Sequence, residues 1–420
     1  MPPRFHLLIA AQFTSALADN ALLIVAIALL VEQGLPGWWA PLLKFALTLS
    51  YVLFAPFVGP LADAFRKARL MAWMNTVKMV GAVLMIAGGH PVLAFAVVGF
   101  GAAAYAPAKY GLITELVPAD RLVAANGWIE VTIVCAALLG SVLGGALVSP
   151  AALASAPFVL AHDALRALPG LHDSAYTASL LALLVVYAAA ALLNIGVPDS
   201  GARYPASRIH VAALSIEFWQ AHRTLWRDRD GALSLAVTTI FWGVGATLQF
   251  AVLRWAAEVL QLPLSQAAYL QAAVAVGVVV GAGAAGRLVP LVRAKRVLGV
   301  GVALGLMMPV VASIDALPLA VPVLALVGAV AGFMVVPLNA LLQLRGCQLL
   351  SAGRSVAVQG FNENASVLGM LAVYALLTAL EVPIVGLLWG FGLCIAAAIA
   401  LLIRSEYSRD RLELSTSAAD

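Results

Sequence analysis

The sequence predicts an all-α integral membrane protein, with twelve transmembrane helices arranged as two six-helix halves that form a parallel repeat. Three observations predict this fold class: a charge-poor composition, apolar segments long enough to cross a bilayer, and short features that recur at a nearly constant offset. Hydrophobic residues make up 63% of the 420 positions and charged residues 10%, with a mean hydropathy of +1.00. Soluble domains carry about 25% charged residues, so the composition excludes an ordinary soluble domain.

Apolar runs of about 20 residues, separated by polar residues or by Gly and Pro, mark the candidate spans. The twelve expected helices cover residues 5–31, 41–62, 70–88, 91–116, 123–148, 175–197, 231–254, 265–288, 297–314, 318–343, 354–379 and 383–404. The first of them contains Ala16-Leu17-Ala18, which resembles the cleavage site of a signal peptide. Its apolar run continues to Val31, beyond the apolar region of a signal peptide, so we expect the N-terminal segment to be retained.

The distribution of basic residues predicts the orientation of the chain in the membrane. With the N-terminus inside, nineteen of the 24 Lys and Arg residues fall in cytoplasmic segments, and positive residues collect on that side. We therefore expect both termini to be cytoplasmic. The expected organisation is an N-terminal half at residues 1–197, a cytoplasmic linker at 198–230, a C-terminal half at 231–404 and a polar cytoplasmic tail at 405–420, without regular structure.

Apolar residues recur at helical spacing within the linker, at Val211, Leu214, Phe218 and Leu225. This pattern is typical of an amphipathic helix that lies at the inner membrane interface. A simple tether between the two halves is the alternative interpretation of the same segment. The outer segment at residues 149–174 is long and fairly apolar, and the sequence assigns it no structure.

The second half of the chain repeats features of the first half in the same order. Four pairs match: Asn126-Gly127-Trp128-Ile129-Glu130 with Gln359-Gly360-Phe361-Asn362-Glu363, Pro107-Ala108-Lys109 with Pro337-Leu338-Asn339, Gly59-Pro60-Leu61 with Gly286-Arg287-Leu288, and Asp19 with Gln249. Each match alone is weak, yet all four offsets lie between 227 and 233 residues. A duplicated six-helix unit predicts a substrate site between the halves, near the middle of the membrane.

The first apolar segment carries a charge at a depth where charges are expensive. At about 1.5 Å per residue, Asp19 lies about 21 Å along the helix from Phe5, inside a hydrocarbon core of about 30 Å. A carboxylate there costs about 2.5 to 3.5 kcal/mol, and such residues usually face a cavity or an opposite charge. The other ionisable residues inside predicted spans include Lys78, Lys109, Glu130 and Glu363.

Functional and structural roles compete for these residues. We favour function for Asp19, Lys109 and Glu363, because ionisable residues inside the membrane are functional candidates by default. Lys109 and Glu130 could instead form an ion pair that neutralises both. For Lys78 the two interpretations are equally compatible with the sequence, because a lysine side chain can extend to the interface.

The loop after the second predicted helix reads Gly59-Pro60-Leu61-Ala62-Asp63, followed by Arg66, Lys67 and Arg69. It resembles the signature loop of the major facilitator superfamily, G-x-L-A-D followed by a basic cluster, but it is one residue shorter and lacks the Gly before the cluster. Asp63 and the basic residues can form charge pairs that hold the inner face closed and break when it opens. We interpret Gly59, Asp63, Arg66 and Lys67 as a gating loop, since membrane anchoring explains the basic residues but not G-x-L-A-D.

Two stretches of small residues have close helix packing as their first interpretation. The fifth predicted helix contains Ala136, Gly140, Ser141, Gly144 and Gly145, close to a motif of antiporters in that superfamily but with Ser141 where they have Pro. The eighth contains Gly281-Ala282-Gly283-Ala284-Ala285-Gly286, which matches the G-x-G-x-x-G pattern of dinucleotide sites. This stretch follows no strand and lies in an apolar span, so the context of a dinucleotide site is missing.

Three longer motifs lie in the first, fourth and tenth predicted helices. They are Ala11-Gln12-Phe13-x-Ser15-Ala16-x2-Asp19-Asn20-Ala21-Leu22-Leu23, Ala102-Ala103-Ala104-Tyr105-x-Pro107-Ala108-Lys109-Tyr110-Gly111 and Val336-Pro337-Leu338-Asn339-Ala340-Leu341-Leu342-Gln343. The motifs resemble those of the bacterial lysophospholipid transporters of the inner membrane, and the resemblance spans nearly all twelve helices. It implies movement of lysophosphatidylethanolamine and related lysolipids from the outer to the inner leaflet. There an acyltransferase/acyl carrier protein synthetase, which we expect to be a separate partner, restores the second acyl chain.

The resemblance and the substrate chemistry together define a candidate site. The head group of lysophosphatidylethanolamine has an ammonium and a phosphate, which call for an anionic and a cationic contact in a low-dielectric site. Our hypothesis is that Asp19, with Glu130 or Glu363, binds the amine and that Lys109 binds the phosphate. The remaining candidate contacts are Asn20, Tyr105, Gln249, Asn339 and Asn364. Some members of the family carry Arg at the position of Gln249, and Arg254, five residues on, points to a different face.

Two other functions fit the same sequence. A proton-coupled antiporter of amphipathic drugs would use Asp19 or Glu363 as its titrating group, and a non-transporting membrane scaffold or sensor would lend its site to an enzyme partner. We expect no enzymatic activity, no cofactor and no metal, and the cysteines have neither disulfide nor metal spacing. The expected partners are the lysophospholipid, membrane lipids and the separate synthetase, not nucleic acid, because the net charge is only +4.

Overall fold

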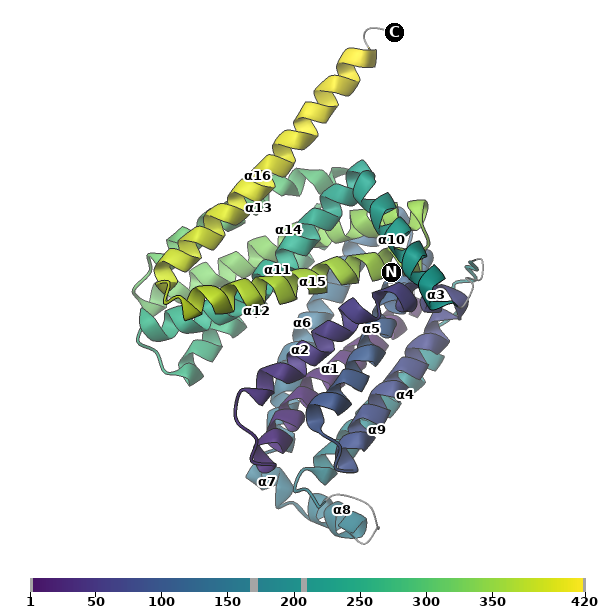
Figure 1. Ribbon diagram of the computed structural model, residues 1–420, viewed down its shortest axis with the longest axis vertical. Helices are drawn as coiled ribbons and strands as arrows, with labels where there is room; N and C mark the ends of the chain where they lie inside the picture. Colours follow the sequence, from purple (N-terminus) through teal and green to yellow (C-terminus); the bar gives the residue numbers. More distant parts are fainter. Residues whose placement is uncertain (1–2, 167–172, 205–209, 418–420) are drawn as a thin grey trace. The chain divides into compact units, whose positions relative to one another are not determined.

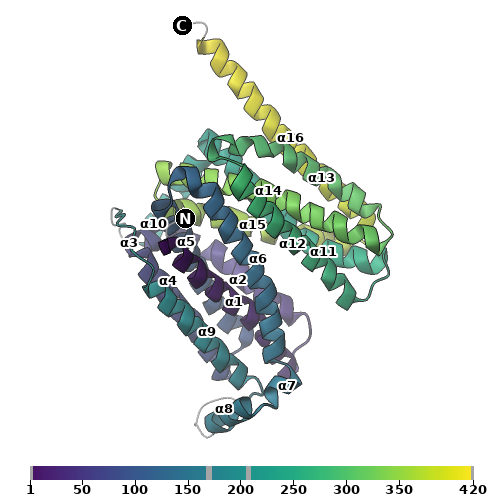
Figure 2. The same cartoon turned by 180° about the vertical axis from the view of Figure 1, so that it is seen from behind.

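Helices make up nearly all of the regular structure, as the apolar runs predict (Figures 1 and 2). The computed structural model describes residues 3–166, 173–204 and 210–417. Its α-helices are α1 (Pro3–Glu32), α2 (Trp39–Leu53), α3 (Ala55–Ala64), α4 (Lys67–Ile86), α5 (Pro91–Leu116), α6 (Leu122–Leu147), α7 (Pro150–Leu153), α8 (Ala156–Arg166), α9 (Thr177–Ile195), α10 (Val211–Arg227), α11 (Arg229–Glu258), α12 (Leu264–Leu288), α13 (Leu298–Ala312), α14 (Leu317–Leu349), α15 (Ala352–Ala379) and α16 (Ile384–Ser417). Two 3₁₀ helices, η1 (Ala119–Arg121) and η2 (Leu291–Val297), precede α6 and α13.

Ten helices of the described residues are long and apolar enough to cross a membrane, and the bent pair of α2 and α3 raises the number to eleven. The all-α membrane fold is therefore confirmed. The remaining predicted span, residues 354–379, corresponds to α15, whose first half contains Gln359, Asn362, Glu363 and Asn364. The total of twelve spans stays a prediction.

Two local expectations are wrong. The predicted helix at 41–62 is two helices, because the chain bends by 66° between α2 and α3, where Pro56 in the first turn of α3 cannot continue the hydrogen bonding of α2. The tail is also helical as far as Ser417, the end of α16, whereas residues 418–420 lie outside the described residues. Glu406 ties this extension to Arg229, at 3.1 Å, and to Lys295, at 3.0 Å.

Several helix ends follow from local sequence signals. Pro91 occupies the first position of α5, and Nδ1 of His90 accepts a hydrogen bond from the Val92 N–H at 3.3 Å. The Asp228 carboxylate accepts a hydrogen bond from the Gly231 N–H at 2.8 Å at the start of α11, a common N-cap arrangement. After α4 the chain turns at Gly88 with φ at +83°, a conformation that glycine adopts without a steric penalty.

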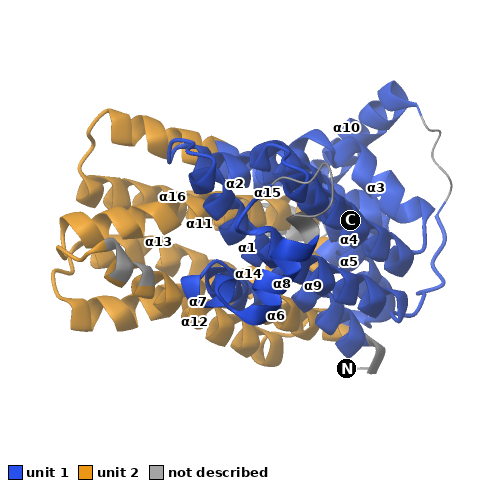
Figure 3. Cartoon of the chain, turned by 90° about the horizontal axis from the view of Figure 1, so that it is seen from below, with its two compact units in different colours: residues 1–119, 132–227, 343–368 blue, residues 120–131, 228–342, 369–420 orange. Residues whose placement is uncertain are grey.

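The chain forms two compact units (Figure 3). Unit 1 comprises residues 1–119, 132–227 and 343–368, and unit 2 comprises residues 120–131, 228–342 and 369–420. The division into chain halves at 1–197 and 231–404, with a linker and a tail, stays a prediction.

In unit 1, α4 packs between α5 and α9, and α1 contacts α5 and α9 (Figures 1 and 2). Its buried apolar core includes Leu22, Val25, Leu29, Phe95, Val98, Leu183 and Tyr187. The small residues of α6 bring that helix against α1: a Cβ atom on Gly140 would lie 2.6 Å from the Leu17 carbonyl oxygen, and one on Gly144 would lie 2.7 Å from that of Ala21. Close packing thus accounts for these glycines.

In unit 2, α13 packs against α16, and α11 contacts α12 and α16. Its core includes Leu233, Val237, Trp255, Leu304, Met308, Leu388 and Ile399. The G-x-G-x-x-G stretch of α12 is a packing surface, because a Cβ atom on Gly281 would overlap the backbone of Ala329 in α14, with the Cα atom at 2.8 Å. No atom within 4 Å would meet a Cβ atom on Gly283.

The different surroundings of Gly281 and Gly283 lead to a testable prediction. Gly281→Val is expected to destabilise the protein by about 1–3 kcal/mol or more, because a side chain forced into a packed helix contact displaces backbone. The matched control is Gly283→Val, which changes the same helix two residues on and is expected to have little effect. Folded yield and thermal unfolding in detergent measure both variants, and equal destabilisation would contradict the packing interpretation.

The outer segment, which the sequence left unassigned, contains α7 and α8, and its residues 167–172 lie outside the described residues. Beyond α8, Glu32 at the end of α1 accepts hydrogen bonds from the Ser174 hydroxyl at 2.6 Å and the Ala175 N–H at 2.8 Å. His162 of α8 lies 3.4 Å from Asp173. The Glu32 contacts attach the C-terminal end of the segment to α1, and the His162–Asp173 contact joins α8 to that end.

The predicted amphipathic helix of the linker is α10, in unit 1. Its buried residues are Leu214, Phe218, Ala221 and Leu225, and the apolar face packs against α3 and against Phe361, whose ring centroid lies 5.4 Å from that of Phe218. Val211, the first residue of α10, is exposed, and the place of the helix at the inner membrane interface stays a prediction. Residues 205–209, including Arg208, lie outside the described part.

Candidate functional site

One face of α1 carries the polar residues of the candidate site in unit 1. Gln12, Ser15 and Asp19 are spaced by three and four residues, so their side chains share one face of the helix. Gln12 and Ser15 are buried, and the Asp19 side chain is 20% exposed. The face therefore presents a carboxylate and two neutral polar groups to the helices packed against it.

Asp19 has two resident partners. The Lys78 ammonium of α4 lies 2.6 Å from Oδ2, and the Tyr187 hydroxyl of α9 donates a hydrogen bond of 2.8 Å to Oδ1. The Lys78 side chain is only 2% exposed, so it does not extend to the interface. The cost of the membrane-embedded carboxylate is thus offset by a buried ion pair, which the sequence did not predict.

A layer of polar and aromatic groups surrounds this ion pair. Lys78 donates a second hydrogen bond to the Ser15 hydroxyl at 3.0 Å, and Ser15 donates to the side-chain amide oxygen of Asn75 at 2.7 Å. The ring of Tyr105, a predicted site residue, lies 5.1 Å from the Lys78 nitrogen, and its hydroxyl donates to Asn194 at 3.4 Å. Tyr105 thus forms the wall next to the lysine.

Lys109 lies at the other end of the α1 face. Its ammonium donates to the side-chain amide oxygen of Gln12 at 3.3 Å and lies 4.1 Å from the centroid of the Tyr110 ring. Gln12 also donates to the Thr132 hydroxyl at 2.9 Å. Gln12 and Asp19 are separated by about 10 Å along the helix. One face of α1 thus carries the Asp19 carboxylate and, about 10 Å away, the hydrogen bond that Gln12 accepts from the Lys109 ammonium.

The predicted residues of α15 lie next to α2 within unit 1. Tyr51 of α2 lies 3.9 Å from the position of a Cβ atom on Gly360 and within electrostatic range of both Asp19 and Glu363. Glu363 accepts a hydrogen bond from Gln359 at 2.8 Å. The amide NH₂ groups of Asn20 and Asn364 each donate to a carbonyl of their own helix at 2.8 Å.

The other three predicted residues belong to unit 2. Glu130 and Asn339 are buried, and Gln249 is exposed, with its backbone carbonyl accepting a hydrogen bond from the Gln271 side chain at 2.7 Å. Arg254 donates to Glu258 at 2.6 Å and to the Val382 carbonyl at 3.3 Å. Two nitrogens of the Arg254 guanidinium are therefore bound within unit 2, and whether Arg254 replaces the Arg that some family members carry at position 249 stays a prediction.

The predicted gating loop contacts the first turn of α15. Asp63 accepts hydrogen bonds from the Ser351 hydroxyl and from the Gly353 N–H, the latter at 3.0 Å. A carboxylate at this position satisfies free N–H groups of a helix N-terminus and interacts favourably with its dipole. Gly59 permits the approach, because a Cβ atom there would lie 2.9 Å from the Cα atom of Arg354.

The basic residues of the loop have acidic partners elsewhere in unit 1. Lys67 lies 2.7 Å from Glu115 with both side chains buried, and Arg66 lies 3.1 Å from Asp199. A hydrogen bond from Arg203 lowers the pKa of Asp199, and Arg66 adds to that effect. The Tyr204 hydroxyl also donates to Glu115 at 2.9 Å, so the start of the linker is attached to the loop.

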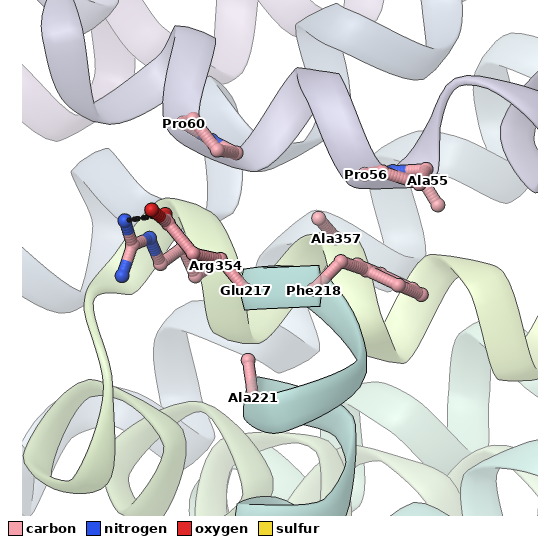
Figure 4. Close-up of a pocket in the computed structure, with 8 residues that line it drawn as sticks. All are labelled: Ala55, Pro56, Pro60, Glu217, Phe218, Ala221, Arg354 and Ala357. Atoms are coloured by element: carbon pink, nitrogen blue, oxygen red, sulfur yellow. Dashed lines mark hydrogen bonds and ion pairs between the residues drawn. The ribbon is translucent and has the colours of Figure 1, made fainter. Parts of the chain in front are cut away.

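Helix α10 lies against the same two helices that meet at Gly59. Glu217 and Arg354 form an ion pair of 2.7 Å, and Figure 4 shows this pair in a pocket that Pro56 and Pro60 of α3 also line. Nearby, His222 lies 3.3 Å from the Asn362 side-chain oxygen, and burial lowers the pKa of His222. Helix α10 thus contacts both α3, which carries Gly59 and Asp63 of the gating loop, and α15.

These contacts predict the effect of removing the Asp63 carboxylate. Asp63→Ala is expected to lower the transport rate by at least about tenfold, because hydrogen bonds to a charged group contribute about 1.5–3 kcal/mol each to one closed arrangement of the loop. Ser351→Ala removes a single hydrogen bond and is expected to have a smaller effect. Initial transport rates of monodisperse protein in vesicles measure both, and wild-type rates for Asp63→Ala would refute the gating role.

An apolar helical bundle with charged side chains paired on an interior helix face is the arrangement of a membrane transporter. The sequence matches the Major Facilitator Superfamily over residues 8–372, and the chain belongs to this superfamily. Curated relatives named "Lysophospholipid transporter LplT" narrow the family. That of Citrobacter koseri is 40% identical over 395 residues, covering 94% of this chain and 93% of the relative. That of Salmonella arizonae is 41% identical with the same coverage, and the chain is thus a member of this transporter family.

Solved structures agree with the fold. The Escherichia coli fucose:proton symporter FucP aligns with a TM-score of 0.71 at 17% identity, covering 95% of this chain and 97% of that chain. A bacterial homologue of the iron transporter ferroportin aligns with a TM-score of 0.69 at 15% identity, covering 96% and 100%. At these identities the likeness concerns the fold alone, and it confirms the predicted major facilitator architecture.

Proposed function

We propose that the protein is a lysophospholipid transporter of the bacterial inner membrane. It moves lysophosphatidylethanolamine and related lysolipids to the cytoplasmic leaflet by alternating access, with both termini in the cytoplasm. The identity of about 40% with transporters of that name over nearly the whole chain supports this function. The polar face of α1 supplies the chemistry.

The observation that carries the proposal is the placement of opposite charges on that face. Asp19 is itself a residue of α1, where its carboxylate pairs with Lys78. The Lys109 ammonium of α5 is hydrogen-bonded to Gln12, on the same face of α1. A zwitterionic head group needs an anionic contact for its ammonium and a cationic contact for its phosphate. We assign Asp19 to the amine and Lys109 to the phosphate.

The remaining predicted residues complete the site in this proposal. Glu130 or Glu363 assists Asp19 with the amine, and Asn20, Tyr105 and Asn364 line the head group. Gln249 and Asn339 add hydrogen bonds. The single acyl chain stays between helices in contact with membrane lipid, and a separate acyltransferase/acyl carrier protein synthetase consumes the product by restoring the second chain.

Transport of labelled lysophosphatidylethanolamine by the purified protein in vesicles tests this function. We expect movement of the lysolipid between leaflets that depends on the protein. Movement that requires an imposed pH gradient, and that extends to amphipathic drugs, would favour the antiporter instead. No substrate-dependent movement in this purified system would favour the scaffold or sensor.

A further inference from the structure

The closest partner of Asp19 is a lysine that the proposed mechanism does not use. We propose that Lys78 determines the head-group range of the transporter: its ammonium neutralises Asp19, so that lysolipids with and without an amine are both accepted. This inference rests on the proposed function and concerns the same site. It assigns a specificity role to a residue that does not itself reach the substrate.

The exposure of the two partners shows which of them a ligand meets. The Asp19 side chain is 20% exposed, whereas that of Lys78 is 2% exposed. The Lys78 ammonium lies behind the carboxylate, between Ser15, at 3.0 Å, and the Tyr105 ring, 5.1 Å away. A head group therefore contacts Asp19, and Lys78 acts on it through the charge that it contributes.

The surroundings of Lys78 tie its charge to Asp19. Among the described residues, Asp19 is the acidic side chain in ion-pair contact with Lys78, and the other neighbours are neutral. Asn75 and Asn194, the next polar groups, accept hydrogen bonds from the hydroxyls of Ser15 and Tyr105 through their side-chain amide oxygens. A buried charge without its partner is strongly unfavourable, so Lys78 remains next to Asp19 when a head group binds.

The sum of charges then decides which head groups are accepted. With Lys78 in place, the pair has no net charge, so Asp19 attracts an ammonium moderately and does not repel an anionic lysolipid. Without Lys78, an uncompensated carboxylate in a low-dielectric site attracts an ammonium more strongly and repels a phosphate that has no amine beside it. Lys78 thus reduces the selectivity for amines and widens the substrate range.

Two lysolipids that differ in the amine test this inference. Lysophosphatidylethanolamine carries one, and lysophosphatidylglycerol has the same phosphate without it. In vesicles, the wild type is expected to transport both with kcat/KM values within about tenfold of each other, since a tenfold ratio corresponds to about 1.4 kcal/mol. In Lys78→Met, the ratio of the ethanolamine to the glycerol lysolipid is expected to rise by at least about tenfold.

Tyr187→Phe is the matched control. It removes a hydrogen bond of 2.8 Å to the other oxygen of the same carboxylate but changes no charge, so the ratio is expected to stay at the wild-type value even if both rates fall. A ratio that changes equally in Lys78→Met and Tyr187→Phe would show a purely structural role and overturn the inference. An unchanged ratio in a Lys78→Met protein that still transports would do the same.

A second variant and the wild type itself serve as controls for a folding defect in Lys78→Met. Lys78→Gln removes the charge but keeps a hydrogen-bond donor for Ser15, and the same rise of the ratio is expected. If neither variant folds, the wild-type comparison decides: a preference for the ethanolamine lysolipid above about 100-fold would contradict a neutralised Asp19. A wild type that moves neither lysolipid would refute the proposed function, and this inference with it, whereas transport without the expected ratios refutes the inference alone.

Discussion

Asp19→Asn is expected to reduce lysophosphatidylethanolamine transport to the background rate. The substitution keeps the shape of the side chain but removes the charge that we assign to the substrate amine. It also leaves the Lys78 ammonium, 2% exposed, without the carboxylate that lies 2.6 Å from it. Removing one partner of a buried ion pair costs about 3–5 kcal/mol. Both the transport rate and the stability of the protein are therefore expected to fall.

The double variant Asp19→Asn/Lys78→Met separates these two effects. It removes both charges, so no unpaired ion remains in unit 1 at this place, and thermal stability is expected to recover relative to the single variant. Transport of the ethanolamine lysolipid is expected to recover only to the level that the wild type shows for the glycerol lysolipid, because the amine still lacks its anionic contact. Transport of the ethanolamine lysolipid by the double variant at the wild-type rate would show that Asp19 acts only as the partner of Lys78.

Lys109→Met is expected to raise the KM for lysophospholipids by about 10- to 150-fold, because a hydrogen bond to a charged group contributes about 1.5–3 kcal/mol. Methionine has a similar length and no charge, so the packing next to Tyr110 is largely kept. The measurement is the concentration dependence of transport in vesicles. A single-chain amine without a phosphate should not be affected to the same extent.

Lys44→Met is the matched control for this variant. Lys44 is also a lysine of a membrane helix, α2, but it is exposed and lies outside the candidate site. We expect no change of KM in Lys44→Met. Equal effects of the two substitutions, or equal loss for the amine that lacks a phosphate, would contradict the assignment of Lys109 to the phosphate.

The helices of this protein were largely predictable because their signals are local. The predicted span 91–116 has the same bounds as α5, where Pro91 begins the helix, and the predicted span 354–379 ends with α15 at Ala379. Apolar run length and the conformational limits of Pro and Gly act within a few residues. The bend before Pro56 and the helical tail were missed, since the first concerns the angle of a break and the second depends on partners of Glu406 that are distant in sequence.

The candidate site was predictable in part. Intramembrane charge selected Asp19, Lys78 and Lys109 separately, and the spacing of Gln12, Ser15 and Asp19 on one face of α1 can be read from the sequence. Nothing in the sequence links Asp19 with Lys78, 59 residues away, or with Tyr187, 168 residues away. Tyr187 and Tyr51 look like ordinary apolar residues of their helices, and no sequence signal distinguishes them.

The sequence by itself determined that the chain is a membrane-embedded helical transporter, which residues carry charge inside the membrane, and where the small residues allow close helix contacts. The helical spans, the charges and the small residues follow from composition, run length and helical periodicity, and the transporter class follows from motifs that resemble those of known transporters. Only the tertiary structure decided that Asp19 is paired with Lys78, that Asp63 meets the first turn of α15, and that Gly281 contacts α14. Pairing of groups far apart in the chain depends on how helices pack side by side, and that packing is set by the fit of many side chains together rather than by any local pattern.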